Sequence, residues 1–419
     1  MTKVARLPLE ALPDFPALCQ IWKVLPQARL VGGAVRDMLN GLPASDFDFG
    51  TPETPSEVMK HLRDAGIGVV PTGLSHGTVT AVIDHRGYEI TTLRRDDVTD
   101  GRHAYVSWTR SWEEDAARRD FTINAMSCDQ EGRIHDYFGG RSDLAAGRIR
   151  FVGDAAMRIR EDALRILRFF RFQARFGSTP PDQDTQEALA QGVRMIDRLS
   201  VERVWSELRR ILTGPRVTDT LQLMEATGVL AACLPELSGT LPEAISLLDA
   251  LIVCGGPSEH CLRTAALLAG AGATPEGVKA CVERLRLSRA DAALIQAFLL
   301  PPPFVPDRVV TDEDVVCVLA ETARDVALGK VWLAEAHQIA SDPARHDARQ
   351  WQRLRSQFSD LPVPVFPLAG RDLLAAGIPP GPRVGELLSE VRLWWMQSGC
   401  RAGHAECLIY LRDLRESFL

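Results

Sequence analysis

The spacing of apolar and polar residues divides the chain into two regions of different character. In the first, helix-like spacing over residues 13–25 and 55–65 alternates with short β-like segments, including a hairpin whose strands are residues 78–83 and 88–93. From Met157 onward, helical periodicity continues to the end and is interrupted by proline- and glycine-rich breaks. The pattern predicts a first part that mixes strands with helices and a second part that is helical.

Two carboxylates end the first β-like stretch. Asp46 and Asp48 are separated by Phe47, and successive side chains on a strand face opposite ways. Both aspartates would therefore share one face, while Phe47 and Phe49 point into a core. Adjacent carboxylates repel each other unless a cation lies between them, and magnesium prefers such oxygen ligands. Taken alone, an Asp-x-Asp pair is also common in surface turns.

A glycine pair precedes these carboxylates. Gly32 and Gly33 begin a helix-like run that carries Arg36. Glycine lets backbone N–H groups come close to an anion, and the start of the helix adds its dipole. Arg36 can then close on the same phosphates. Taken alone, Gly-Gly indicates only a turn, but the pair followed by the two aspartates predicts a metal–triphosphate site.

Two later segments add to this picture. Glu89 lies on the second hairpin strand, and a position beside the Asp-x-Asp strand would make it a third carboxylate. Glutamates on strands more often face solvent, so both readings stay open. Residues 94–114 have no clear period and are rich in polar residues. Such a segment between ordered elements is usually functional or disordered, and we expect a loop there.

Residues 159–172 predict one helix with an apolar stripe and a polar stripe. Asp162, Arg165 and Arg168 form the polar stripe, and Arg171 continues it with some drift. A solvated face with Asp–Arg pairs is one account of this stripe. The alternative is recognition of a base, because a carboxylate acceptor beside a guanidinium donor complements the edge that cytosine and adenine share. Guanine and uracil would leave buried groups unpaired, at about 1–3 kcal/mol each.

The composition is that of an ordinary globular protein, and its 419 residues predict about two to four domains. The formal net charge of −7 excludes a uniformly basic coat for nucleic acid but allows a local basic face. The nine cysteines form no Cys-x-x-Cys pair, so we expect reduced thiols rather than structural zinc or disulfides. No segment resembles a signal peptide or a membrane span, so we expect a cytoplasmic protein without a membrane partner.

Five ordered motifs resemble those of the class II nucleotidyltransferase family, which holds the tRNA CCA-adding enzymes and the bacterial poly(A) polymerases. The resemblance covers residues 30–212 and, more weakly, a helical hairpin at residues 370–395. The motifs are Gly32-Gly33-x-x-Arg36-Asp37 with Asp46-x-Asp48, GLSHGT in the hairpin (73–78), RRDFTINAM (118–126), EDALRILRFFRF (161–172) and LSVERVW (199–205).

The resemblance implies an α+β fold, in which a small nucleotidyltransferase head with a mixed β-sheet and helices is followed by all-helical domains. The head would span residues 1–150 and carry out catalysis. A helical neck (151–215) would select the base, and a helical body (216–340) and a tail (341–419) would follow, with tRNA bound by the tail. The segment that begins at Ser200 would support the neck helix.

The resemblance also implies the reaction, which is addition of CCA to the tRNA 3′ end from CTP and ATP without a nucleic-acid template. Catalysis would be phosphoryl transfer with two Mg²⁺ ions held by Asp46 and Asp48, and Glu89 is the candidate third carboxylate. Asp120 would support Arg119, and Glu161 would orient Arg165. The residues implied to bind the nucleotide are Gly33, Arg36, Arg119, Asp162, Arg165, Arg168 and Arg171.

Two alternatives remain at this stage. Within the family, the enzyme could add only A or only CC, or could be a poly(A) polymerase. The GLSHGT motif and the polar segment after Arg94 favour full CCA addition. The acidic balance and the absence of a basic C-terminal extension argue against a poly(A) polymerase. Outside the enzymes, an inactive RNA-binding scaffold is disfavoured because the motif residues are intact. The sequence leaves the oligomeric state open.

Overall fold

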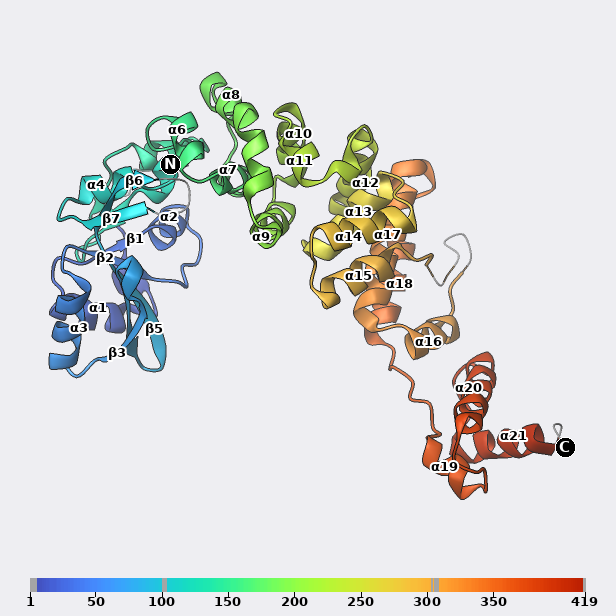
Figure 1. Cartoon of the computed structure of the whole chain (residues 1–419). Coiled ribbons are helices and arrows are strands. Elements are labelled where there is room, and N and C mark those ends of the chain that lie inside the picture. The colour runs from blue at the N-terminus through green and yellow to red at the C-terminus, as the bar shows by residue number, and fades with distance from the viewer. Residues whose placement is uncertain (1–5, 100–103, 303, 305–308, 417–419) are drawn as a thin grey trace. The chain divides into compact units, whose positions relative to one another are not determined.

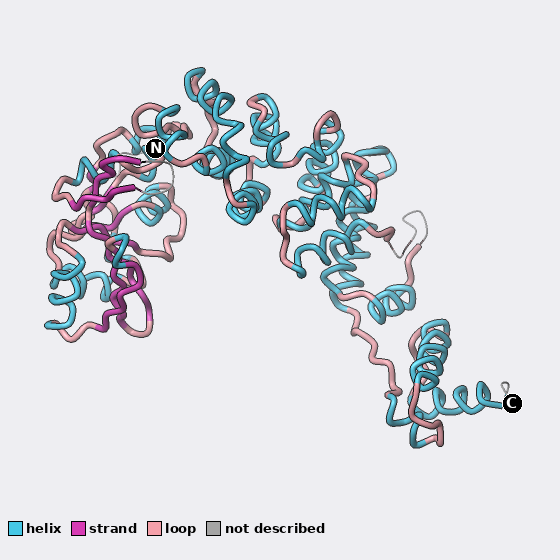
Figure 2. Tube along the Cα trace, viewed as in Figure 1, coloured by secondary structure: helices cyan, strands magenta, loops and turns pink. Residues whose placement is uncertain are grey.

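The computed structural model describes residues 6–99, 104–302, 304 and 309–416 (Figure 1). The chain divides into two compact units, Met1–Pro235 and Glu236–Leu419. The N-terminal unit combines β-sheet with helices, whereas the described part of the C-terminal unit consists of helices and loops (Figure 2). This arrangement confirms the predicted α+β fold. The finer domain boundaries at residues 150, 215 and 340 stay predictions.

The N-terminal unit is built on a seven-stranded mixed sheet with the strand order β3-β4-β5-β2-β1-β8-β9. β2 lies inside the sheet, antiparallel to β1 and parallel to β5. The β4–β5 hairpin is as predicted, with positive φ angles at Asp84 and His85 in its turn. The strands are β1 (Arg29–Val31), β2 (Asp48–Thr51), β3 (Gly68–Gly73), β4 (Thr78–Ile83), β5 (Arg86–Thr92), β8 (Ser127–Cys128) and β9 (Ile134–His135).

A separate two-stranded sheet occupies most of the segment predicted to be a loop. β6 (Arg94–Thr99) pairs antiparallel with β7 (Ala104–Trp108), and α4 (Trp112–Ala117) follows. The prediction of a loop over residues 94–114 is therefore wrong for these elements. Backbone hydrogen bonds carry the pairing of the two strands, so the polar residues of β6 need no alternating apolar pattern, and β7 is a stretch of only five residues.

Two helices of the N-terminal unit, α1 and α3, begin and end close to the predicted residues 13–25 and 55–65. α3 starts with a capping box, in which the Thr54 hydroxyl accepts from the Glu57 N–H and the Glu57 carboxylate accepts from the Thr54 N–H. The helices are α1 (Phe15–Val24), α2 (Gly33–Leu39), α3 (Pro55–Asp64), α5 (Gly140–Ala145), α6 (Ala155–Glu161), α7 (Leu164–Phe176), α8 (Gln183–Gly192), α9 (Val201–Leu212), α10 (Val217–Ala226) and α11 (Val229–Cys233).

The segment predicted to be one helix over residues 159–172 is broken at Asp162. α6 ends at Glu161, Asp162 is extended with φ −150° and ψ 107°, and α7 begins at Leu164. The Asp162 carboxylate accepts a hydrogen bond of 3.0 Å from the Leu164 N–H. This local bond competes with helical hydrogen bonding, as aspartate commonly does at the start of a helix. The prediction that Asp162 and Arg165 share one continuous helix face is therefore wrong.

In the described part of the C-terminal unit, one apolar cluster surrounds Trp351 and Phe358 and another surrounds Trp395 and Leu411. Throughout the described ranges, every helix is too short or too polar to span a membrane. All nine cysteines are free thiols, as predicted. The helices are α12 (Leu241–Val253), α13 (His260–Gly270), α14 (Pro275–Arg284), α15 (Arg289–Leu299), α16 (Asp312–Glu321), α17 (Arg324–Ser341), α18 (Ala348–Asp360), α19 (Gly370–Ala375), α20 (Pro382–Gln397) and α21 (His404–Glu416).

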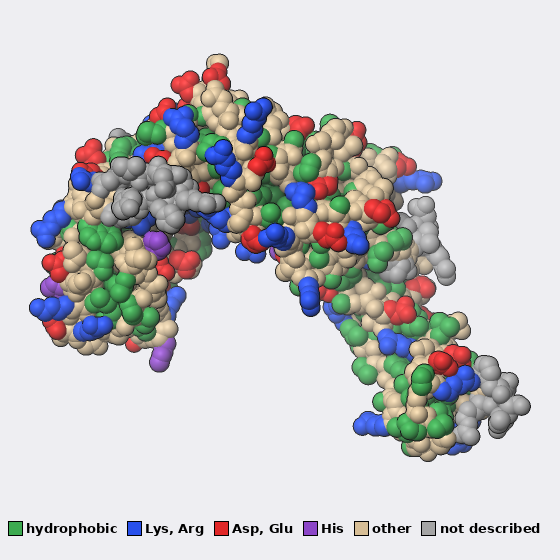
Figure 3. Space-filling model, viewed as in Figure 1, with side chains coloured by type: hydrophobic (Ala, Val, Ile, Leu, Met, Phe, Trp, Pro, Cys, Tyr) green, Lys and Arg blue, Asp and Glu red, His purple; other side chains and the backbone are tan. Residues whose placement is uncertain are grey.

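The visible surface has no uniform charge. On the face drawn in Figure 3, Lys and Arg side chains are interspersed with Asp and Glu side chains. This distribution agrees with the formal net charge of −7, which excludes a continuous basic coat. Specific chemistry is therefore sought in cavities rather than in the overall charge.

Four phenylalanines join α7 to the segment that follows α4. The Phe121 ring lies 4.8 Å from Phe151, 6.2 Å from Phe169 and 5.3 Å from Phe172, measured between ring centroids. All four side chains are buried. Aromatic pairs at these separations add to the stability that burial alone provides. The cluster therefore fixes α7 against the residues that precede Phe121.

Replacing Phe121 with alanine should lower the free energy of unfolding of the N-terminal unit by about 3–5 kcal/mol, because loss of its ring leaves a cavity between the three remaining rings. Chemical unfolding followed by intrinsic fluorescence measures this change. The matched control is Met157→Ala, whose side chain is exposed, with an expected change within about 0.5 kcal/mol. Equal unfolding midpoints for the two variants would contradict the assigned role of the cluster.

Candidate active site

A cavity of about 480 Å³ lies in the N-terminal unit. It is lined by residues of the predicted metal–triphosphate site and by residues of the polar stripe that begins at Asp162. Asp46 is the one predicted site residue that is not part of its lining, and it lies two residues before Asp48. The cavity size suits a small-molecule ligand. The predicted residues that line it are Gly33, Arg36, Asp48, Glu89, Arg119, Asp162, Arg165, Arg168 and Arg171.

The central strands of the sheet bring the carboxylates together. Asp48 is the first residue of β2, and Asp46 lies in the preceding loop, yet Phe47 and Phe49 are buried and the two aspartates are exposed, as predicted. Because β2 and β5 run parallel with Phe49 opposite Ile90, Glu89 lies beside Asp48. Partial burial and the carboxylates of Glu89 and Asp46 raise the pKa of Asp48 to about 6, although Arg119 acts in the opposite direction.

These carboxylates have the properties of a site for divalent cations. Within the described part of the chain, neither Asp48 nor Glu89 forms an ion pair with an arginine or a lysine. Their mutual repulsion is therefore not neutralised by the protein itself. Oxygen ligands of this kind suit Mg²⁺, which keeps some of its water and binds substrate phosphates as well.

The glycine pair allows two guanidinium groups to approach the backbone. Gly32 lies at the N-cap of α2 with φ +67°. This backbone conformation is strained for residues that have a side chain and is readily adopted by glycine. A Cβ atom on Gly32 would lie 3.4 Å from Arg119 Nη1, and one on Gly33 would lie 3.6 Å from Arg36 Nη2. Both arginines therefore lie against bare backbone, beside N–H groups that can bind phosphate.

Arg36 is held by several contacts and is only 7% exposed. Its Nε donates to Asp37 at 2.9 Å and its Nη1 donates to the Asn124 side-chain oxygen at 2.6 Å. The rings of Phe172 and Phe176 lie 5.1 and 4.7 Å from its guanidinium carbon. Burial lowers the pKa of Arg36, and Asp37 opposes this effect. The guanidinium is therefore fixed at the edge of the cavity.

Arg118 and Arg119 share one buried carboxylate. Asp115 accepts from Arg118 at 2.7 Å and from Arg119 at 3.2 Å. Burial alone would raise the pKa of Asp115, but the two arginines hold it below its usual value. Asp115 thereby orients two cations at the cavity, of which Arg119 was predicted and Arg118 was not.

Asp120 connects the predicted RRDFTINAM motif with α7. Its Oδ2 accepts from Arg168 Nε at 2.7 Å and from Arg168 Nη2 at 2.5 Å, and its Oδ1 accepts from Asn124 Nδ2 at 3.0 Å. Burial would raise the pKa of Asp120, but Arg168 and Asn124 hold it below its usual value. Since Asn124 also accepts from Arg36, one hydrogen-bonded network runs from Arg36 to Arg168.

The Asp162 carboxylate is held from two sides. One oxygen accepts from the Leu164 N–H, and Arg203 Nη2 on α9 lies 3.3 Å from Oδ2. The Asp162 side chain stays 38% exposed, so its oxygens retain acceptor capacity toward the cavity. The helix that begins after Ser200 was predicted to support the neck helix, and through Arg203 it also contacts Asp162 directly.

Arg165 is oriented by three acceptors. Its Nη1 donates to Glu161 Oε2 at 2.5 Å and to the Arg158 carbonyl at 3.1 Å, and its Nη2 donates to the Arg118 carbonyl at 3.2 Å. Glu161 thus makes the contact expected of a residue that orients Arg165. A guanidinium has five N–H donors, so these three bonds leave two donors for a ligand.

Arg171 pairs with a buried glutamate on α9. The shortest distance from Arg171 Nη1 to the Glu207 carboxylate is 3.3 Å, and Glu207 is 4% exposed. Burial lowers the pKa of Arg171 to about 10, while Glu207 acts in the opposite direction. The guanidinium lines the cavity and is held from behind by α9.

Sequence reasoning missed several residues that order this site. Asp115 carried a usable signal, because it lies three and four positions before Arg118 and Arg119 on a helix. Arg203 and Glu207 carried none, because their partners lie far away in the sequence, and Asn124 lies inside the RRDFTINAM motif but one of its two partners, Arg36, is distant. The missed residues are Asp115, Arg118, Asn124, Arg203 and Glu207.

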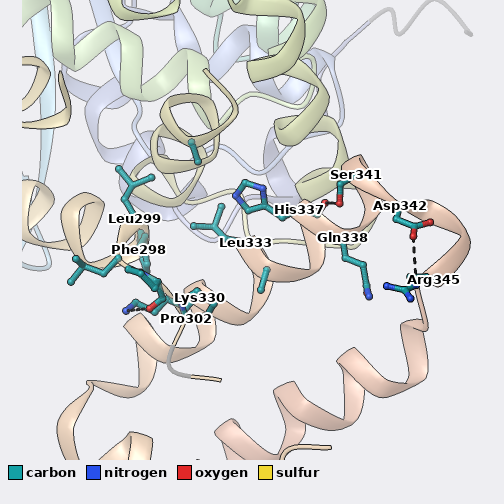
Figure 4. Close-up of a pocket in the computed structure, with 14 residues that line it drawn as sticks. Phe298, Leu299, Pro302, Lys330, Leu333, His337, Gln338, Ser341, Asp342 and Arg345 are labelled. Carbon is teal, nitrogen blue, oxygen red and sulfur yellow. Dashed lines mark hydrogen bonds and ion pairs between the residues drawn. The ribbon is translucent and has the colours of Figure 1, made fainter. Parts of the chain in front are cut away.

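The C-terminal unit holds a second cavity, of about 450 Å³, with different chemistry. Apolar side chains such as Phe298 and Leu333 line it together with Lys330 and His337 (Figure 4). Among its described lining residues, Asp342 is the one carboxylate. This cavity therefore lacks the adjacent carboxylates that metal-dependent phosphoryl transfer requires.

A group of potential metal ligands occurs at the start of α13, also in the C-terminal unit. Glu259, His260 and Cys261 offer ligand atoms within 4.8 Å of one another. The Glu259 oxygens accept from the N–H groups of Cys261 and Leu262 at 2.9 and 2.7 Å. Glu259 thus serves as the helix N-cap, which accounts for its position without a metal.

Known proteins resemble both units. Residues 28–150 match the family described as the poly A polymerase head domain, and residues 180–240 match a probable RNA and SrmB-binding site of polymerase A. The mitochondrial CCA tRNA nucleotidyltransferase 1 of Mus musculus is 35% identical over 407 residues, or 92% of this chain and 86% of that protein. The CCA-adding enzyme of Limosilactobacillus fermentum is 30% identical over 92% of this chain and 93% of its own.

A solved structure also resembles this chain over most of its length. The CCA-adding enzyme of Bacillus stearothermophilus, determined in complex with CTP, has a TM-score of 0.77 and 29% identity, and the match covers 97% of this chain and 98% of that one. The chain therefore belongs to the family of CCA-adding tRNA nucleotidyltransferases.

Proposed function

We propose that this protein adds CCA to the 3′ end of tRNA from CTP and ATP, without a nucleic-acid template. One observation carries the proposal. A single cavity combines the neighbouring carboxylates Asp48 and Glu89 with arginines and with the acceptor–donor pair of Asp162 and Arg165. The family is one of metal-dependent nucleotidyltransferases. The relatives named above support CCA as the product, since their names state that activity.

The carboxylates provide the catalytic end of the cavity. Two Mg²⁺ ions, held by Asp46 and Asp48 with Glu89 as the third carboxylate, would lower the pKa of the RNA 3′-hydroxyl and stabilise charge on the triphosphate and the leaving pyrophosphate. β2 holds Asp48 beside Glu89 before any ligand arrives, so little reorganisation is needed. The hydroxyl oxygen attacks the α-phosphorus as the bond to the β-phosphate oxygen breaks.

The arginines position the triphosphate. Arg36 and Arg119 lie against Gly32 and Gly33, so their guanidinium groups and the backbone N–H groups can contact the same phosphates. Arg168 and Arg171 extend the cationic wall toward the base. Each of these side chains is already held by an acceptor, which reduces the entropy lost when the nucleotide binds.

Base selection depends on the hydrogen-bonding capacity left on Asp162 and Arg165. A carboxylate oxygen accepts from the amino group of cytosine or adenine, and a free guanidinium N–H donates to the adjacent ring nitrogen. Guanine and uracil present a carbonyl and a protonated ring nitrogen there, so both groups would face like partners. The same two side chains thus accept C and A and reject G and U.

Two further statements remain proposals. Within the family, A-only or CC-only addition and poly(A) synthesis are the alternative products. We also propose a cytoplasmic location. The vertebrate relatives are named as mitochondrial proteins, so the location needs its own measurement by fractionation or tagging.

The first test is nucleotide addition to a tRNA transcript that lacks its 3′ end, in Mg²⁺. With CTP alone the transcript should grow by two residues, and with CTP and ATP it should grow by three and end in A. Sequencing gels or mass spectrometry resolve these products. A long A tail, or growth only on a transcript already ending in CC, would assign one of the alternative products. No incorporation with tRNA still bound would favour a scaffold.

Asp48→Asn should lower the rate of nucleotide addition by about 1,000-fold or more, because losing a metal ligand removes several kcal/mol of transition-state stabilisation. Binding of tRNA, measured by filter retention, should stay within about twofold. Removing divalent cations with EDTA should abolish addition by the unmodified enzyme. Glu131→Gln, an exposed carboxylate in the same unit, is the control and should keep full activity. Comparable activity of the two variants would refute the role of Asp48.

Asp162→Asn should relax base choice, because one acceptor oxygen becomes a donor while the size and the cap to Leu164 are kept. The preference for CTP over UTP in kcat/KM should fall about 10-fold to 100-fold. Single-turnover assays with each nucleotide measure this ratio. Asp182→Asn is the matched control, since Asp182 also caps a helix by accepting from the Thr185 N–H at 2.8 Å. Equal preference ratios in both variants would rule out selection by Asp162.

A further inference from the structure

Two thiols in the C-terminal unit are in contact, although they lie far apart in the sequence. Cys317 belongs to α16, and Cys400 follows α20 with φ +59°. Their Sγ atoms are 3.9 Å apart. Each thiol is partly exposed, so a small oxidant can reach the pair. This is the one thiol–thiol contact among the nine cysteines, all of which lie within the described ranges.

Polar contacts around the pair join α16 to α20 and to the segment that follows α20. Arg392 on α20 donates to the Ala320 carbonyl at 2.8 Å, and Arg401 lies 3.1 Å from Glu313. The Cys317 thiol itself donates to the Met396 carbonyl at 3.4 Å. Side-chain contacts at a surface are weak and open readily. A covalent link here would therefore change how freely α20 separates from α16.

We propose that Cys317 and Cys400 form an oxidation site, at which a peroxide converts the two thiols into an intramolecular disulfide. Nothing in the proposed nucleotide chemistry uses these residues, so the site lies outside the catalytic function. In a disulfide the two sulfur atoms lie about 2.05 Å apart. Rotation of the two side chains would have to bring the Sγ atoms from 3.9 Å to this separation. The modification would tie the end of α20 to α16.

The chemistry is a two-electron oxidation. One thiolate attacks an oxygen of the peroxide, the O–O bond breaks, and a sulfenic acid forms as the first water leaves. The second thiol attacks this sulfur, the S–O bond breaks, and the second water leaves with the remaining protons. Two thiols and one hydrogen peroxide thus yield one disulfide and two waters.

The surroundings predict the order of these steps. Burial and the neighbouring Cys317 thiol raise the pKa of Cys400 to about 12. The thiolate is the form that attacks peroxide, so this shift disfavours a first attack by Cys400. Cys400 then completes the bond because it is already in contact, and its high effective concentration compensates for a small thiolate fraction.

The direct test is a peptide map of the full-length protein, reduced and then treated with hydrogen peroxide. Trypsin places Cys317 in peptide 309–324 and Cys400 in peptide 393–401, each with one cysteine. The expected product is these two peptides joined, with the mass of two hydrogen atoms lost, and dithiothreitol should separate them. The proposal is overturned if they stay unlinked when the exposed Cys19 is fully oxidised, or if they link mainly to other cysteines.

Hydrogen exchange tests the structural consequence on the same protein. Backbone amides of α20 should exchange at least about tenfold more slowly after oxidation, because the disulfide limits local opening. Cys317→Ser should abolish both the link and the slowing, whereas Cys19→Ser should keep both. The peptide map of the unmodified chain still decides the question if Cys317→Ser folds poorly. Unchanged exchange in fully linked protein would refute the tethering of α20.

Discussion

The ion pair between the buried Asp120 and the partly exposed Arg168 is the contact on which the geometry of the cavity depends. Its carboxylate joins the RRDFTINAM segment to α7 through two hydrogen bonds, and it also orders Asn124 and hence Arg36. Breaking such a pair leaves a buried charge without a partner, at about 3–5 kcal/mol. The pair therefore fixes the position of the α7 arginines relative to the carboxylates of the sheet.

The cavity contains two kinds of carboxylate. One kind is paired with arginines and orients them, and the other kind is available to bind a cation. Asp115 and Asp120 are buried against arginines, which hold their pKa values below the usual range. Asp48 has a pKa of about 6 because partial burial and two neighbouring carboxylates act on it together. A protein that folded for stability alone would pair Asp48 or Glu89 with one of the nearby arginines. Keeping them unpaired leaves electrostatic energy that a bound cation can release.

Much of the fold and of the cavity was predictable from the sequence, because period and motif spacing are local signals. The β4–β5 hairpin, α3 and the exposed pair Asp46 and Asp48 followed from alternation. The β6–β7 ribbon was missed, since β6 is polar and pairs through backbone bonds, and the short apolar run of β7 was read as part of one aperiodic segment. The break at Asp162 was missed because an aspartate inside a helical period reads as a face residue until its capping bond is seen. Partners such as Arg203 and Glu207 depend on how α9 packs against α7, which no local pattern encodes.

The break at Asp162 matters for the proposed reading of a base. In one continuous helix, the Asp162 side chain would be free to choose among rotamers, and a pairing with Arg165 would consume the groups that a base needs. In the broken segment, Leu164 and Arg203 hold the carboxylate, while Glu161 and two backbone carbonyls hold the guanidinium. The Asp162 carboxylate and the Arg165 guanidinium are thus held by other partners and not by each other. One acceptor oxygen and two N–H donors remain available for a ligand. In the proposed base selection, this remaining acceptor and these donors form the hydrogen-bonding pattern that a nucleotide must match.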